Sequence, residues 1–180
     1  MAPLPTAWAV GRGMQGTGGV YPRDRMSDFT LTPIGAVRST RTAPEDDRWD
    51  SVSSSIELDA TQFTPDALAA LDTFSHLEVV FLFDRVDPAK IERGARRPRD
   101  NPAWPLVGIF AQRGKARPNR IGTTICRIDR VDGLTVHVTG LDAIDGTPVL
   151  DLKPWVREFG PRGEVRQPDW MTDLMRAYWR

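Results

Sequence analysis

Charged residues that can bind anions gather in one stretch of this chain, residues 108–122. A predicted strand there ends in a loop that carries four cations: Arg113, Lys115, Arg117 and Arg120. The planar fork of arginine binds phosphate or carboxylate in a bidentate way, so the loop is a candidate anion or nucleotide site. An exposed basic turn explains the same residues equally well, and at this point both interpretations stay open.

A second polar stretch, residues 141–155, combines two carboxylates, an ammonium group and an indole. Asp145 precedes a glycine, which is ordinary turn chemistry. Asp151 and Lys153 lie two residues apart on a predicted strand, so their side chains lie on one face and can interact. Together with Trp155 they form a candidate polar site at a strand edge.

Other familiar chemistry is excluded by the sequence. Residues 11–16 fit G-x-G-x-x-G, but neither an entering strand nor a following helix accompanies them, so the dinucleotide fingerprint is rejected. The single cysteine, Cys126, excludes an internal disulfide and a thiolate metal cluster. Two histidines are too few for a convincing zinc site. We therefore expect no metal.

The hydrophobic pattern from residue 29 onward is that of a β-protein. Predicted strands and one hairpin occupy residues 29–38, 55–58, 76–83, 106–111, 123–140 and the second half of 141–155. Strands without βαβ alternation, and with only two short helices, favour a closed or nearly closed antiparallel β-barrel. The predicted fold class is mainly β.

The hairpin is predicted to turn through a three-residue loop, residues 131–133. That register pairs Ile128 with Val136 and Cys126 with Val138, which gives one apolar face. It also puts the glycine of the loop in the left-handed position of a bulged turn. Cys126 is then a buried core thiol.

Two short helices are predicted. Thr64 caps the first, with Pro65 at its first helical position. The second begins at Pro168 and puts Trp170, Leu174 and Tyr178 on one stripe.

The chain is predicted to have three parts. Residues 1–28 form a glycine-rich tail, residues 29–160 form the barrel, and residues 161–180 form a linker and a helix that docks on the barrel or on a dimer partner. No apolar run of about 20 residues predicts a membrane span, and no signal-peptide pattern begins the chain. We expect a soluble, cytoplasmic protein.

The zero net charge conceals an uneven distribution. Residues 42–84 hold ten acids and one arginine, whereas residues 85–130 hold twelve basic residues and four acids. A basic middle third is compatible with binding to a polyanion such as nucleic acid.

Five short stretches together resemble one known family. They are Ile34-Gly-Ala-Val-Arg-Ser39, Phe74-Ser-His-Leu77, Gly108-Ile-Phe-Ala-Gln-Arg113, Arg117-Pro-Asn-x-Ile-Gly122 and Asp145-Gly-Thr-Pro-Val-Leu-Asp-Leu-Lys-Pro154. In order and spacing the chain resembles the β-barrel, S-adenosylmethionine-dependent tRNA N6-adenosine methyltransferases. The resemblance covers about two thirds of the chain.

This resemblance implies a homodimer that binds adenosylmethionine and methylates N6 of threonylcarbamoyl-adenosine, at position 37 of threonine tRNA. It also implies the cofactor contacts: Glu45, Asp46, Asp47, Arg48, Asp84, Arg85, Arg113, Thr123, Thr139, Gly140, Leu141 and Asp142.

For catalysis, we expect Asp145 to accept a hydrogen bond from N6, while Lys153 fixes Asp151 and the strand edge. The predicted RNA-binding residues are Arg97, Arg99, Lys115, Arg117 and Arg120. Trp104 or Trp155 is expected to stack on a base. Two rival functions are a barrel that binds adenosylmethionine or another adenine nucleotide without methylating tRNA, and a methyltransferase for a different substrate.

Overall fold

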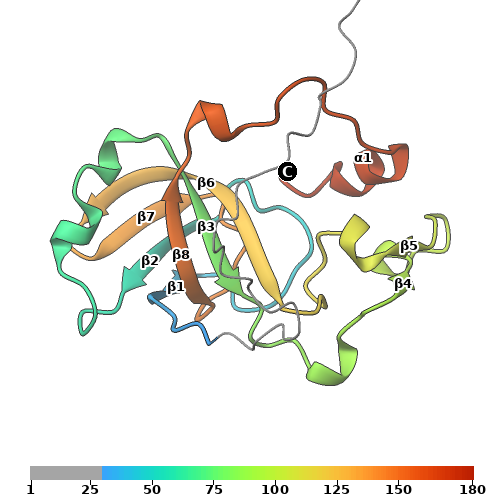
Figure 1. The fold of residues 1–180 in the computed structure, drawn as a ribbon, viewed down its shortest axis with the longest axis horizontal. Coiled ribbons are helices and arrows are strands. Elements are labelled where there is room, and N and C mark those ends of the chain that lie inside the picture. The colour runs from blue at the N-terminus through green and yellow to red at the C-terminus, as the bar shows by residue number, and fades with distance from the viewer. Residues whose placement is uncertain (1–29) are drawn as a thin grey trace, which may run out of the picture. The chain divides into compact units, whose positions relative to one another are not determined.

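Six strands close into an antiparallel barrel in the order β1-β2-β7-β6-β3-β8 in the computed structural model, which describes residues 30–180 (Figure 1). Two further strands, β4 and β5, form a small separate sheet. The bounds are β1 Gly35–Ser39, β2 Ser53–Leu58, β3 His76–Leu82, β4 Ala95–Arg96, β5 Val107–Gly108, β6 Ile121–Asp132, β7 Thr135–Thr139 and β8 Pro148–Pro154. The predicted fold class, a mainly β protein with a closed antiparallel barrel, is confirmed.

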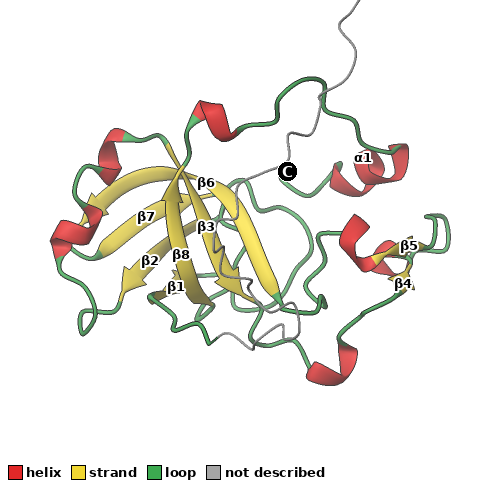
Figure 2. Cartoon of the chain, in the orientation of Figure 1, coloured by secondary structure: helices red, strands yellow, loops and turns green. Residues whose placement is uncertain are grey.

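The helices of the described residues are all short (Figure 2). Six are single 3₁₀ turns, and α1 runs from Asp169 to Met175. Within residues 30–180, no helix has both the length and the apolar character needed to cross a bilayer. The 3₁₀ turns are η1 Pro65–Leu68, η2 Leu71–Thr73, η3 Pro88–Lys90, η4 Pro98–Asp100, η5 Ile109–Ala111 and η6 Arg157–Phe159.

The barrel interior is filled by alternate side chains of its strands. In β3, Leu77, Val79 and Phe81 are buried and their neighbours are more exposed; Val136 and Val138 do the same in β7. Period-two alternation of this kind is what a strand with one inward face requires. The predicted burial of Cys126 is confirmed, and burial raises the pKa of its thiol to about 12.

The predicted register of the β6–β7 hairpin is wrong. Val131 pairs with Val136, so the turn is shorter than the predicted three-residue loop, and Ile128 pairs with Val138. Between these two pairs, from Ile128 to Arg130, the register shifts by one residue. A one-residue slip moves a side chain to the other face of a strand. Because the bulge adds one residue to β6, Val136 and Val138 both have an apolar partner there. It leaves Asp129 in the bulge, where its carboxylate accepts hydrogen bonds from Thr139 and Arg127.

Predicted boundaries also need correction. Residues 106–111 do not form one strand: β5 ends at Gly108 and η5 follows, because only Ile109 of that run is buried. The first strand begins at Gly35, after Pro33, since proline interrupts a strand ladder. The side chain of Thr64 makes no cap hydrogen bond to η1.

The helix predicted from Pro168 is confirmed but ends at Met175, so Tyr178 lies beyond it. The predicted tail, residues 1–28, falls outside the described part of the chain.

Candidate functional site

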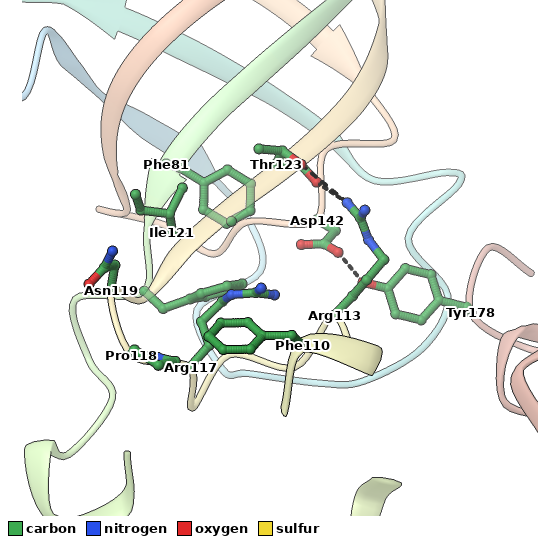
Figure 3. Close-up of a pocket in the computed structure, with 12 residues that line it drawn as sticks. Phe81, Phe110, Arg113, Arg117, Pro118, Asn119, Ile121, Thr123, Asp142 and Tyr178 are labelled. Atoms are coloured by element: carbon green, nitrogen blue, oxygen red, sulfur yellow. Dashed lines mark hydrogen bonds between the residues drawn. The ribbon is translucent and has the colours of Figure 1, made fainter. Parts of the chain in front are cut away.

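A pocket of about 410 Å³ opens at the end of the barrel where β3 ends and β6 begins (Figure 3). A cavity of this size is large enough for a small organic ligand. Phe110, Pro118 and Asn119 lie on one side of it, and Arg113 and Tyr178 lie on the other. The full lining is Phe81, Phe83, Phe110, Arg113, Arg117, Pro118, Asn119, Ile121, Gly122, Thr123, Asp142 and Tyr178.

Two phenylalanine rings form the inner wall of the pocket. Phe81 and Phe83 pack edge to face, with ring centroids 5.2 Å apart. A Cβ atom on Gly122 would lie 2.4 Å from the Phe81 ring and 2.9 Å from the Phe83 ring. Glycine is therefore needed at this position, because a Cβ atom would clash with both rings.

Arg113 reaches the pocket from the segment after η5. Its Nη2 donates to the carbonyl oxygen of Thr123 at 2.9 Å and to the hydroxyl of Thr123 at 3.2 Å. The segment is anchored by Gln112, whose side-chain amide donates to the carbonyl oxygens of Arg96 and Val107, each at 3.0 Å. A buried glutamine directly after a 3₁₀ turn, and not the predicted buried strand, thus positions the guanidinium.

Asp142 is the acid of the pocket lining, and it is partly buried. It follows Leu141, which is fully buried, and it accepts a hydrogen bond from the hydroxyl of Tyr178. Burial raises the pKa of Asp142 to about 6, while the Tyr178 hydrogen bond and the Arg113 charge act in the opposite direction. Burial and the neighbouring carboxylate also raise the pKa of Tyr178.

The C-terminal segment brings Tyr178 to the pocket. The amides of Arg48, Trp49 and Asp50 donate to the carbonyl oxygens of residues 177, 178 and 179, at 3.2, 3.0 and 3.1 Å. Trp49 is buried, and the guanidinium of Arg41 lies 4.1 Å from its ring centroid. The predicted cofactor residue Arg48 therefore has a backbone role here, with a positive φ of 67°.

Three of the acidic residues predicted to contact the cofactor form ion pairs, and two of these pairs involve residues predicted to bind RNA. Arg99 donates to both carboxylate oxygens of Asp47, at 2.7 and 3.1 Å, and Lys115 lies 3.7 Å from Asp46. Glu45 pairs with Arg41 at 3.3 Å. These three acids lie outside the pocket lining.

Further predicted cofactor contacts lie at the same end of the barrel but do not line the pocket. Arg85 donates to the carbonyl oxygens of Thr42 and Asp145, at 3.2 and 2.8 Å. The backbone oxygen of Asp84 accepts from Arg120 at 3.4 Å.

The loop before Asp142 contributes backbone and core contacts. Thr139 donates to Asp129 at 2.6 Å, Gly140 has a φ of 86°, and the Leu141 side chain belongs to the core. Of the twelve predicted cofactor residues, the structure brings together Arg113, Thr123 and Asp142 around one cavity.

The three predicted catalytic residues lie outside the pocket lining. Asp145 accepts a hydrogen bond from the Ser39 amide at 3.1 Å, beside its turn. Asp151 and Lys153 form the predicted ion pair on the outer face of β8, where both side chains are about half exposed. The structure does not bring this pair to the cavity.

The remaining predicted RNA-binding residues lie in or near the loops that follow β3. Arg117 lines the pocket and donates to the carbonyl oxygen of Gln112 at 3.3 Å. Arg97 donates to the carbonyl oxygen of Trp104. The Trp104 indole in turn donates to Asp173 of α1 at 3.0 Å, which ties this loop to the C-terminal segment.

Sequence reasoning missed several pocket residues. Phe81 and Phe83 lay in a predicted strand, so period-two spacing indicated a shared face but not that the face lines a cavity. Phe110 was predicted to be part of a buried strand, yet 78% of its surface is exposed at the rim. No pattern in the sequence indicates that Tyr178, beyond α1, contacts a loop 36 residues earlier.

Comparison with known proteins gives related sequences and structures. The chain matches the family model for the tRNA-methyltransferase O N-terminal domain over residues 36–160. It is 35% identical over 102 residues to a human tRNA (adenine(37)-N6)-methyltransferase, a match that covers 57% of this chain but only 23% of that protein. It therefore spans less than a quarter of the human protein's length.

A second relative has nearly the same length as the match. It is a probable S-adenosyl-L-methionine-binding protein of Methanothermobacter thermautotrophicus, 35% identical over 148 residues, which cover 77% of this chain and 99% of that protein. The crystal structure of TrmO from Pseudomonas aeruginosa superposes with a TM-score of 0.64 at 27% identity, over 79% of this chain and 62% of that one. The chain belongs to the tRNA-methyltransferase O N-terminal domain family.

Proposed function

We propose that this chain is an adenosylmethionine-dependent methyltransferase acting on N6 of adenosine 37 in tRNA. The finer part of the proposal is that its substrate is the threonylcarbamoyl-adenosine of threonine tRNA. One observation carries it: aromatic rings, a guanidinium and a carboxylate surround a single cavity in a barrel of this family.

The residues of the pocket fit adenosylmethionine. Phe81 and Phe83 offer an apolar wall for an adenine ring. Arg113 is a donor for a carboxylate, and both hydrogen bonds that it donates to Thr123 come from one nitrogen, Nη2. Charge-assisted bonds from a guanidinium are strong and specific, which supports Arg113 as the main polar anchor.

Bound adenosylmethionine supplies a methyl group on a sulfonium, which is activated for in-line displacement. The protein's main contribution is to hold the accepting nitrogen in line with that methyl group and to exclude water. The N6 lone pair is conjugated with the adenine ring, so a carboxylate that accepts the N6–H helps to localise it. Asp142 and Asp145 are the two candidates in this loop.

tRNA would approach across the rim of the pocket. Phe110 is exposed there, and Arg117 lies beside it in the lining. Splayed single-stranded bases stack on aromatic side chains, and phosphates bind arginine. Arg97 and Arg120 add positive charge to nearby loops. The proposal includes a homodimer in the cytoplasm, and light scattering of the pure protein tests the assembly.

A second candidate function is an adenosylmethionine-binding protein without tRNA methylation. The Methanothermobacter relative, named a probable S-adenosyl-L-methionine-binding protein, favours it, because that protein matches over almost its whole length. Under this alternative the pocket contacts stay necessary, whereas the exposed rim has no role.

One experiment separates the two. The protein is incubated with labelled adenosylmethionine and total tRNA from a strain that lacks its own enzyme of this family, and the nucleosides are then analysed. Label in the N6-methyl form of threonylcarbamoyl-adenosine supports the finer proposal. Label in another nucleoside supports a different substrate, and binding in a calorimeter without transfer supports the binding protein.

A further inference from the structure

Asp142 is the only acid among the described residues that line the pocket. It lies between the phenylalanine wall and the Arg113–Tyr178 side (Figure 3). Its neighbours along the chain, Leu141 and Ala143, are both buried. A carboxylate held in apolar surroundings at the edge of a cavity is a recurrent arrangement at sites of proton transfer.

The charged and titratable groups around Asp142 come from three segments. Tyr178 of the C-terminal segment donates its hydroxyl hydrogen to Oδ2. Arg113, after η5, adds positive charge from the same lining, as does Arg117 further along that loop. The charge of Arg99 lowers the pKa of Tyr178. The Tyr178 hydrogen bond and the Arg113 charge favour the ionised carboxylate, and burial opposes it.

Asp145, the other carboxylate of the loop, has different surroundings. Its Oδ1 accepts from the Ser39 amide at 3.1 Å, and its backbone oxygen accepts from Arg85 at 2.8 Å. It does not line the pocket. Its observed contacts are those of a residue that stabilises a turn.

We propose that Asp142 is the catalytic proton acceptor for methyl transfer to N6, and that Tyr178 is a positioning residue that holds its carboxylate toward the cavity. This inference rests on the proposed function. In the step, the N6–carbon bond forms and the carbon–sulfur bond breaks, with its electron pair going to sulfur. The proton that leaves N6 passes to the carboxylate of Asp142 and then to water.

The protonation behaviour of Asp142 suits this role. A base is most effective when its pKa lies near the working pH, and burial raises the pKa of Asp142 to about 6. The rate should therefore fall as the pH drops below about 6, because the carboxylate becomes protonated. Removing the Tyr178 hydroxyl removes a stabiliser of the ionised form, so the pKa should rise further.

The test uses the full chain with four variants: Asp142→Asn, Tyr178→Phe, Asp145→Asn and Asp132→Asn. Asp132 lies at the end of β6, away from the lining, and its variant is the control for loss of one acid. Affinity for adenosylmethionine is measured by calorimetry, and single-turnover methylation of tRNA is measured from pH 5 to 9. The carboxyl resonance of Asp142 is titrated by NMR in the ligand-free protein.

We expect Asp142→Asn to slow transfer by about 100-fold or more while adenosylmethionine affinity changes less than about threefold. Tyr178→Phe should move the acid limb of the rate profile, and the NMR titration, upward by about one pH unit. Asp132→Asn should leave both measurements unchanged.

Three results would overturn the proposal. A loss of affinity in Asp142→Asn that matches its loss of transfer would make Asp142 a cofactor contact. A 100-fold slower Asp145→Asn beside a normal Asp142→Asn would assign the proton to Asp145. An unshifted NMR titration in Tyr178→Phe would remove the positioning role. Failure of the proposed function is a separate result, in which wild-type protein binds adenosylmethionine and methylates no tRNA. That result would also rule out the catalytic role of Asp142.

Discussion

The pocket and the outer face of β8 both gather charged side chains, but the surroundings of those side chains differ. In the pocket, Arg113 and Asp142 belong to different loops and line the same cavity together with aromatic rings. On β8, Asp151 and Lys153 come from one strand, and they pair with each other in contact with solvent. The first arrangement leaves polar groups directed at a cavity, while the second satisfies them within the pair.

The difference shows that proximity of charges does not by itself make a site. Period-two spacing brings Asp151 and Lys153 together on any strand, and an exposed pair of this kind contributes little free energy. A cavity requires loops from several strands to converge, here at the end of the barrel. We therefore expect function to depend on the pocket, and the following substitutions test that comparison.

Among these substitutions, the largest effect is expected for Arg113→Ala, which removes the guanidinium from the pocket. Adenosylmethionine should bind about 10- to 100-fold more weakly, since a hydrogen bond to a charged group contributes about 1.5–3 kcal/mol. Calorimetry measures the change. Arg130→Ala, on the exposed part of β6, is the matched control, and equal losses in both variants would remove Arg113 from the binding site.

Gly122→Ala tests whether the inner wall of the pocket requires close packing. The new Cβ would lie 2.4 Å from the Phe81 ring, so the free energy of unfolding should fall by about 1–3 kcal/mol in urea denaturation. At Gly108 an added Cβ would meet nothing within 4 Å. Gly108→Ala should therefore stay within about 0.5 kcal/mol of wild type, and similar stabilities for the two variants would contradict this account of the wall.

Phe110→Ala tests the rim of the pocket separately from its interior. Loss of a stacking ring should raise the KM for tRNA about fivefold, the lower end of what one base–aromatic contact contributes, while adenosylmethionine affinity stays nearly constant. Phe159→Ala is the control, because that ring is also exposed, at 81%, but lies outside the pocket. An unchanged KM in Phe110→Ala would place the RNA elsewhere.

The smallest effect is expected for Lys153→Ala on β8. Its ion pair with Asp151 is exposed to solvent, so the melting temperature should stay close to that of wild type and the methylation rate should stay within about twofold. The measurement is a thermal melt together with the tRNA assay. A loss of transfer comparable to that of pocket variants would instead confirm the catalytic role predicted from the sequence, and the comparison between the two regions would fail.

The fold class was predictable because it depends on local patterns. Alternation along residues 76–83 and the apolar residues of the hairpin require strands with one inward face. The closed barrel follows because several such strands must bury that face together. The hairpin register was not predictable in the same way, since a bulge at Asp129 gives Val136 and Val138 apolar partners other than the predicted ones, with a different turn.

The candidate site, too, was predictable only in part. From the sequence, the family resemblance implied Arg113, Thr123 and Asp142 as cofactor contacts, and Arg113 lies within one of the matching stretches. Only the tertiary structure decided which of the nominated residues surround one cavity, and that Tyr178 joins them. The physical reason is that a strand's period fixes which face a residue takes, whereas contacts between loops distant in sequence depend on how the whole barrel closes.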